Sequence, residues 1–339
     1  MRNIIAEPIK EESPEIAGSS GRFWGALLLR TLMKFLPFVA VIILFIIFSF
    51  TANNFFTVRT VLTLALQTSA ITLMGIGVTF TIITGGIDLS IGSVVALTGT
   101  IAVMVALEGV PIWLSWIIGL LVGGICGLLN GLMITKMKLP PFIATLGMMM
   151  VARGVALTIT NANAWPAPKG FGELGNGTIL GTGQKFPGIS YPVIIMIVVA
   201  LVFSFILSKT RLGRYTYATG SNEEAARLSG IKIHRIKNIN YVFSGLLAGL
   251  VGIILASRMV TSQPNSAVGY EMNAIAAAVI GGASLMGGVG TVGGTVIGSF
   301  IIGILTVGLT MSGANYFMQQ IVIGLVVIGA VTVDRLRSR

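Results

Sequence analysis

A single carboxylate stands within one of the most apolar stretches of the chain. Asp88 lies in TIITGGIDLSIGSVVAL, residues 81–97, where every other side chain is uncharged. An ionisable group inside a membrane is costly, so it is a functional candidate by default. Small and hydroxyl-bearing residues surround Asp88, which favours a break in a helix where exposed backbone faces a polar path. These neighbours are Gly85, Gly86, Ser90 and Ser93.

Three roles for Asp88 fit this pattern. Its side chain could cap the helix that begins directly after it by accepting backbone N–H groups. It could instead pair with Arg153 of MMMVARGVAL, unless Arg153 binds backbone carbonyls. It could also contact a transported solute, and a neutral polyol needs hydrogen-bonding groups rather than charge. The candidate residues of such a solute path are Asp88, Ser90, Ser93, Thr98 and Asn130.

Motifs for nucleotide, metal or nucleophilic chemistry are missing from the sequence. No Gly-x-x-x-x-Gly-Lys-(Ser/Thr) occurs, so the usual loop for nucleotide phosphates is absent. The only histidine, His234, stands in a basic segment without a Cys or carboxylate cluster, which argues against a metal site and histidine-based catalysis. Cys126 among apolar residues is typical of a small buried side chain. We expect no catalytic residue and no metal in this chain.

The composition places these residues in a membrane protein. Of 339 residues, 54% are hydrophobic and only 10% are charged, against about 25% charged in a soluble domain. Runs of about 20 apolar residues can cross a bilayer, and ten runs fit, which predicts an all-α polytopic protein. They cover residues 35–52, 60–83, 89–107, 111–134, 140–160, 191–208, 238–257, 271–286, 289–310 and 315–333. The eighth is short and broken by glycines, so it could be a half-helix or a re-entrant segment.

The positions of the charges predict the orientation. If the chain starts inside the cell, most of its 22 basic residues fall in internal segments, as the positive-inside rule requires. The formal charge of +11 therefore needs no nucleic acid to explain it. Residues 1–34 contain four glutamates among five basic residues and read as a retained cytoplasmic tail, and residues 334–339 form a cytoplasmic C-terminal tail. We expect residues 35–333 to form the membrane domain.

Two long connections separate the predicted spans. Residues 161–190, on the external side, are rich in Gly, Pro and Asn, so they should be irregular, as a passive connection or a docking site for an outside partner. Residues 209–237, on the internal side, contain a short helix with Ser221 and Glu224 as a capping box and Gly230 as its stop. In that helix Glu223 and Arg227 lie on one face. It is either a solvated connection or a docking element.

A short pattern occurs twice in the chain. GGIDLSIG at 85–92 and GGASLMGG at 281–288 share Gly-Gly-x-(Asp or Ser)-Leu-x-x-Gly. Transporters are often built from duplicated halves with broken helices at corresponding positions. We therefore predict helix breaks near 84–92 and 279–292. The glycines Gly85, Gly86, Gly281 and Gly282, together with Arg153, are candidates for structural or gating roles.

Four stretches together resemble one protein family. TGGIDLSIGSVVALTG (84–99), PPFIATLGMMMVARG (140–154), TRLGRYTYATGSNEEAARLSGI (210–231) and GYEMNAIAAAVIGGASLMGGVGTVGGTVIG (269–298) are similar to the permease subunits of bacterial ABC importers for monosaccharides. The likeness is to the ribose-type permeases, which share a superfamily with the branched-chain amino-acid permeases. It extends from about residue 35 to residue 333.

The resemblance implies the partners and the energy source. Such permeases hold no ATP, so ATP and Mg²⁺ would sit on a cytoplasmic ATPase; a second permease subunit, as homodimer or related heterodimer, and an extracytoplasmic sugar-binding protein complete the assembly in the inner membrane. The internal helix looks like the ABC-importer coupling motif Glu-Ala-Ala-x-x-x-Gly, although it departs from the longer form of that motif because no Leu-Pro follows at the expected distance. The residues expected to couple to the ATPase are Arg211, Arg214, Glu224, Ala225, Ala226 and Gly230.

The sequence as a whole predicts a permease that passes a monosaccharide, with ribose or a similar pentose first, into the cytoplasm. An ion-coupled secondary transporter of a small polar solute is the alternative. That class would need paired carboxylates within the membrane, and Asp88 is the one clear intramembrane carboxylate.

Overall fold

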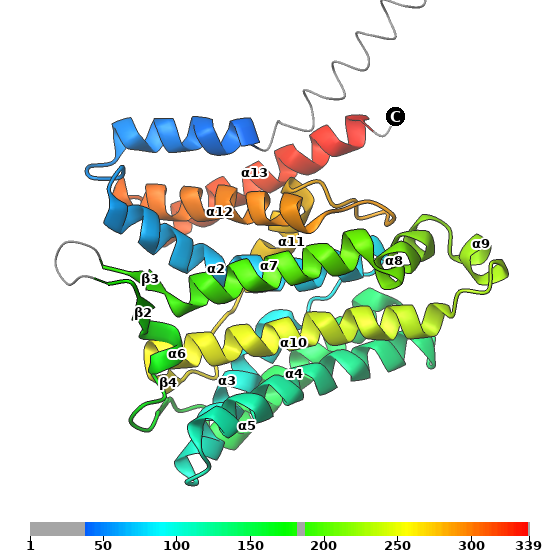
Figure 1. The fold of residues 1–339 in the computed structure, drawn as a ribbon, viewed down its shortest axis with the longest axis horizontal. Coiled ribbons are helices and arrows are strands. Elements are labelled where there is room, and N and C mark those ends of the chain that lie inside the picture. The colour runs from blue at the N-terminus through cyan, green and yellow to red at the C-terminus, as the bar shows by residue number, and fades with distance from the viewer. Residues whose placement is uncertain (1–37, 182–186, 338–339) are drawn as a thin grey trace, which may run out of the picture.

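The chain folds into a bundle of long helices that run side by side along the molecule (Figure 1). The computed structural model describes residues 38–181 and 187–337. The first helix is Phe38–Thr51. The others are α2 (Val58–Ile83), α3 (Ile91–Leu107), α4 (Ile112–Thr135), α5 (Pro141–Thr160), α6 (Glu173–Asn176), α7 (Tyr191–Lys209), α8 (Arg211–Ser221), α9 (Glu223–Leu228), α10 (Ile233–Met259), α11 (Tyr270–Ile280), α12 (Val292–Met311) and α13 (Tyr316–Arg337).

Each of the ten apolar runs contains a helix. Six of these helices are long and apolar enough to cross a membrane, namely α2, α4, α5, α7, α10 and α12. The apolar parts of the other four are shorter: Phe38–Thr51, α3, α11 and Tyr316–Gly329 of α13. The structure therefore supports an all-α membrane protein, and the count of ten crossings stays a prediction. The tail at 1–34 lies outside the described residues, and α13 continues past residue 334 to Arg337.

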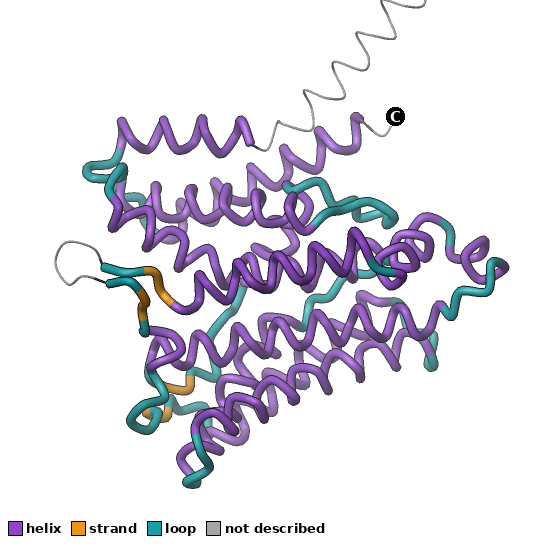
Figure 2. The backbone as a smooth tube through the Cα atoms, in the orientation of Figure 1, coloured by secondary structure: helices purple, strands orange, loops and turns teal. Residues whose placement is uncertain are grey.

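The ends of the bundle differ in structure. One end carries α8 and α9, and the other carries α6 with four two-residue strands (Figure 2). Strand β1 (Trp165–Pro166) pairs antiparallel with β4 (Thr261–Ser262), and β2 (Thr178–Ile179) pairs antiparallel with β3 (Ile189–Ser190). The β1–β4 pair ties the long connection at 161–190 to the end of α10. We call these the α8 end and the strand end.

The connection at 161–190 is anchored more firmly than its composition predicts. Phe171 is fully buried, and its carbonyl accepts a hydrogen bond of 2.7 Å from the Ser257 hydroxyl of α10. The same hydroxyl oxygen accepts the backbone N–H of Gly175 at 2.8 Å. The segment therefore packs onto α10 instead of standing free, because these buried backbone groups need partners.

Helix α10 lies at the centre of the bundle and packs against α2, α3 and α4. Glycines bring α4 and α10 together backbone to backbone. A Cβ at Gly123 would overlap the carbonyl oxygen of Gly245, and one at Gly245 would overlap that of Gly123. Small residues at such crossings are the usual basis of helix association in membranes, because they let two backbones approach closely.

The internal connection at 209–237 forms two helices, which corrects the predicted capping. Asn222, not Ser221, begins α9, because its side-chain oxygen accepts the N–H of Ala225 at 2.9 Å. Glu224 lies 3.7 Å from Arg227, whereas Glu223 pairs with Lys237 at 2.6 Å. Glu223 and Arg227 lie four residues apart on α9, as predicted, but their ion pairs are with Lys237 and Glu224.

The stop after α9 is as predicted. Gly230 has φ +82°, a left-handed conformation that glycine adopts without strain.

Candidate functional site

Asp88 lies in the non-helical segment between α2 and α3, at the predicted break. Gly85 has φ +76°, so the chain turns sharply as it leaves α2. The Thr145 hydroxyl of α5 holds the segment by donating to the Ile87 carbonyl at 3.0 Å. Only 1% of Asp88 is exposed. The carboxylate is therefore enclosed by the chain's own helices.

Hydroxyl groups satisfy the Asp88 carboxylate. Oδ1 accepts the N–H of Ser90 at 3.0 Å and its hydroxyl at 2.6 Å, while Oδ2 accepts the Ser244 hydroxyl of α10 at 2.7 Å. The Asn130 amide of α4 donates to the Ser90 oxygen at 2.9 Å. These four residues form one buried network, which we call the Asp88 network. A buried charged group is tolerated when its oxygens are hydrogen-bonded in this way.

The structure brings together three of the five predicted path residues. Asp88, Ser90 and Asn130 belong to the Asp88 network, and Ser93 and Thr98 do not. Ser93 is buried, and its hydroxyl makes no hydrogen bond among the described residues. The Thr98 hydroxyl donates back to the carbonyls of Val94 and Val95 of its own helix, at 2.9 and 3.1 Å. The role of all five in a solute path stays a prediction.

Sequence reasoning missed two residues of α10. Ser244 lies 156 positions from Asp88, and a serine in an apolar helix gives no signal of such a contact. Tyr241 is 1% exposed, its hydroxyl faces Gly86, and that hydroxyl has no partner among the described residues. Asn130 Oδ1 is likewise unpaired. The Asp88 network therefore contains one unpaired acceptor, Asn130 Oδ1, and the unpaired Tyr241 hydroxyl lies on the same helix as Ser244.

Arg153 does not pair with Asp88. Its Nη1 donates to the carbonyl oxygens of Pro264 and Ser266, at 2.6 and 2.8 Å. Of the two predicted partners, Asp88 and backbone carbonyls, the structure therefore shows the carbonyls. These carbonyls lie in the irregular segment between β4 and α11. Arg153 therefore fixes this segment against α5.

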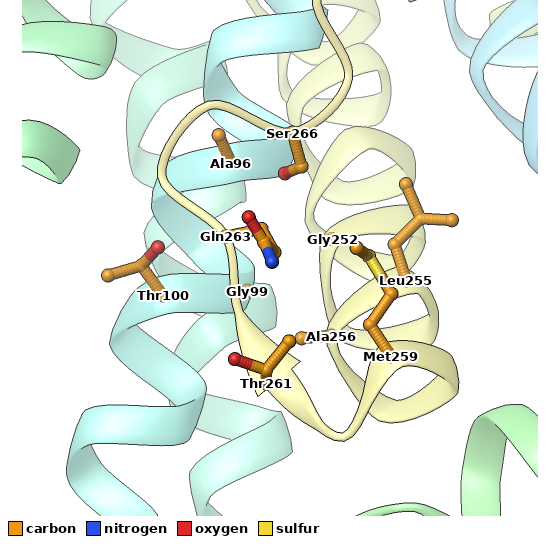
Figure 3. A pocket seen from close by; sticks show the side chains of 10 residues that line it. All are labelled: Ala96, Gly99, Thr100, Gly252, Leu255, Ala256, Met259, Thr261, Gln263 and Ser266. Carbon is orange, nitrogen blue, oxygen red and sulfur yellow. The ribbon is translucent and has the colours of Figure 1, made fainter. Parts of the chain in front are cut away.

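A small cavity lies beneath the same segment, between α3 and α10 (Figure 3). It encloses about 10 Å³, which is room for about one water molecule. Its walls are small residues of α3 and both small and large residues of α10, among them Leu255 and Met259, and Gln263 and Ser266 lie over it. None of the five predicted path residues lines it.

The second glycine pattern also forms a non-helical segment, between α11 and α12. Gly281 packs so tightly that a Cβ would overlap the Gly294 carbonyl oxygen, and Gly282 has φ +92°. The N–H of Met286 donates to the Ser284 oxygen at 3.3 Å, as the N–H of Ser90 does to Asp88. The two segments share this turn, and the internal repeat itself stays a prediction.

Both glycine segments meet at the last turn of α8. The Gly288 N–H donates to the Ile83 carbonyl at 2.8 Å, and a Cβ at Gly220 would overlap that carbonyl oxygen. The Tyr217 hydroxyl donates to the Gly290 carbonyl at 2.6 Å. Burial raises the pKa of Tyr217, so the phenol keeps its donor proton at neutral pH. We call this contact of α8 with the two segments the glycine junction.

The residues expected to couple to an ATPase lie on α8, on α9 and just after α9. All but Ala226 are exposed, which leaves Arg211, Arg214, Glu224, Ala225 and Gly230 at the surface. Leu228 of α9 is 83% exposed, a large apolar side chain on a helix too short to cross a membrane. Among the described residues there is no group of three or more His, Cys, Asp and Glu that could hold a metal ion.

The long apolar helices define a multi-pass α-helical membrane protein. The family described as the permease component of branched-chain amino acid transport systems matches residues 60–331. The chain belongs to this family.

The relatives cover nearly the whole chain. The ribose import permease RbsC of Escherichia coli K12 is 42% identical over 306 residues, 89% of this chain and 94% of the relative. RbsC of Bacillus subtilis 168 is 42% identical over 307 residues, 91% and 94% of the two chains. The D-allose permease AlsC of E. coli K12 is 36% identical over 304 residues, 89% and 91%. No solved structure gives a significant match.

Proposed function

We propose that this chain is the membrane-spanning subunit of an ABC importer that passes a monosaccharide, ribose or a similar pentose, into the cytoplasm. One observation carries the proposal: RbsC proteins from two distant bacteria, both named ribose import permeases, are each 42% identical to this chain over almost their full length. Relatives named for D-allose and L-arabinose are 36% identical, which supports the sugar class more broadly.

Hydrolysis of ATP belongs to a partner in this proposal. Helices α8 and α9 form the docking element for a cytoplasmic ATPase that holds ATP and Mg²⁺. The exposed Leu228 and Glu224 of α9 support this role, because a short helix with an apolar anchor fits a groove on a partner. The glycine junction supports it further, since it joins α8 to segments within the bundle.

The orientation follows from the charges. Arg211 and Arg214 and the basic residues that begin α10 lie at the α8 end, so we place this end and both termini in the cytoplasm of a bacterial inner membrane. The strand end then faces outward, where the connection at 161–190 receives the sugar-binding protein. A second permease subunit pairs with this one in the bilayer.

Asp88 supports the start of α3 in the conformation described. Both of its oxygens are occupied by Ser90 and Ser244, and the cavity between α3 and α10 does not include it. Ser90, not Asp88, is the N-cap residue of α3, and its side chain makes no capping hydrogen bond. Asp88 instead accepts the N–H of Ser90 in a turn just before the helix, so a structural role beside α3 is better supported than helix capping. A direct contact with the sugar would require the Asp88 network to open.

Two exposed leucines test the ATPase docking. The chain is co-expressed with a candidate ABC ATPase from the same genome and purified in detergent, as wild type, Leu228→Asp and Leu180→Asp. Leu180 is 72% exposed at the strand end, so it is a matched control. We expect wild type and Leu180→Asp to retain the ATPase and Leu228→Asp to lose it. Absence of the ATPase from all three folded forms would overturn the importer proposal.

Transport identifies the sugar. Proteoliposomes with the chain, the ATPase and the binding protein should take up D-ribose only when ATP is supplied, and a proton or sodium gradient alone should drive none. Uptake driven by an ion gradient without ATP would establish the ion-coupled alternative instead.

A further inference from the structure

The glycine junction places three backbones in direct contact. At Gly220, the only side chain that fits is a hydrogen atom, because any Cβ would collide with the Ile83 carbonyl oxygen and lie 2.7 Å from the Gly288 nitrogen. Gly287 and Gly288 have φ +87° and +75°, which lets the second segment turn against α8. Any movement of the end of α8 toward these backbones would therefore displace the C-terminus of α2 and the segment before α12.

Tyr217 adds a specific bond to this contact. Its hydroxyl donates to Gly290, two residues before α12 begins at Val292. Tyr215, on the same helix, is exposed, and its hydroxyl makes no hydrogen bond within the described residues. Of these two tyrosines of α8, only Tyr217 is hydrogen-bonded to the segment before α12.

The glycine junction is connected to the Asp88 network through the chain segment that follows α2. Ile83 ends α2, and Asp88 follows it by five residues in a segment that is hydrogen-bonded to α4, α5 and α10. α9, in contrast, projects from the bundle, and Ala226 is its one buried residue. α9 reaches a long helix at the start of α10, through the Glu223–Lys237 ion pair, whereas contact with α2 and with the segment before α12 is made by α8.

We propose that the last turn of α8 transmits ATPase movement into the membrane domain, with Tyr217 and Gly220 as the positioning residues that move both glycine segments together. The proposal rests on the proposed function, in that it requires an ATPase at α8 and α9. It assigns the two helices different tasks: α9 provides the docking surface, and α8 carries the displacement to the starts of α3 and α12.

The test compares Tyr217→Phe with Tyr215→Phe in the full transporter. Both variants remove one oxygen from α8, and only the first removes a hydrogen bond. We expect Tyr217→Phe to keep ATPase binding and hydrolysis but to lower the sugar moved per ATP about two- to tenfold, the change that one neutral hydrogen bond supports. Tyr215→Phe should match wild type. Equal ratios for the two variants would overturn the proposal, whereas a purely structural role for Tyr217 would lower hydrolysis and transport together.

A second measurement does not depend on the identity of the sugar. Hydrogen–deuterium exchange of residues 281–290 is followed in the chain bound to its ATPase, with and without a non-hydrolysable ATP analogue. Nucleotide should change the exchange of this segment in wild type and Tyr215→Phe, and not in Tyr217→Phe. A nucleotide response that persists in Tyr217→Phe would refute the role of this bond, even if the transported solute is not ribose.

Discussion

The contact between Ser244 and Asp88 can be tested by removing one atom. Ser244→Ala deletes the hydroxyl that donates to Oδ2 at 2.7 Å, at a site where both residues are 1% exposed. No other donor to Oδ2 lies among the described residues. A hydrogen bond to a charged group contributes about 1.5–3 kcal/mol, and interhelical hydrogen bonds in membrane proteins average about 0.6 kcal/mol. We expect a loss of about 2 kcal/mol in unfolding free energy, because the acceptor is a buried carboxylate.

Ser93→Ala is the matched control for this change. Ser93 is also a buried serine near the start of α3, 3% exposed, but its hydroxyl makes no hydrogen bond within the described residues. Its replacement should alter stability by less than about 0.5 kcal/mol, the range of substitutions that break no named interaction. The assay is reversible unfolding of the purified chain in mixed micelles with increasing denaturing detergent. Equal losses for the two variants would refute the reasoning.

A double-mutant cycle isolates the pair. If Ser244 stabilises the protein through Asp88, the effects of Ser244→Ala and Asp88→Ala should fall short of additivity by about 1–2 kcal/mol, as expected for residues in direct contact. Additive effects would show that Ser244 acts through packing alone.

Two further predictions concern other contacts. Arg153→Gln should free the segment after β4 and speed hydrogen–deuterium exchange around Pro264, because both hydrogen bonds from Nη1 to backbone carbonyls are lost. Arg59→Gln, at the exposed start of α2, is the control and should leave this exchange unchanged. Unchanged exchange in both variants would contradict the role given to Arg153. Gly123→Ala should destabilise the fold by about 1–3 kcal/mol through overpacking against α10, and Gly154→Ala, which has open space around it, should not, as measured in the same micelles. A stable Gly123→Ala variant would show that the α4–α10 contact is looser than described.

The sequence predicts the helices well because their signal is local. Ten apolar runs predict ten helices, and the breaks beside Gly85 and Gly281 fall where glycines interrupt those runs. Composition alone does not decide whether a run of 11 residues such as α11 crosses a membrane, because crossing depends on length and on neighbouring helices.

Local competition between similar residues explains the error at α9. Ser221 and Asn222 are both good N-cap residues, so the sequence allows a start at either. The structure uses Asn222, because α8 continues through Ser221. Glu223 then lies within reach of Lys237, fourteen residues away, a pairing that periodicity within one helix cannot reveal.

The partners of buried polar groups are the least predictable part of the site. Asp88 bonds to Ser90 by a contact across two residues, which the sequence indicates, and to Ser244 by packing of α10 against α3, which it does not. Arg153 had two plausible types of partner, and the structure selects carbonyls that lie 111 and 113 residues away. Such contacts depend on the tertiary arrangement of helices rather than on any local pattern.

The structure explains why a carboxylate stands in this apolar stretch. Breaking a membrane helix exposes backbone N–H groups that lipid cannot satisfy, and Asp88 satisfies that of Ser90 while it binds α10 through Ser244. Because α2 ends at Ile83, the Ile83 carbonyl is free to accept the Gly288 N–H at the glycine junction. An unbroken apolar helix would supply neither that contact nor the polar network five residues later. The carboxylate therefore stabilises the break between α2 and α3, the segment on which the proposed displacement of α8 would act.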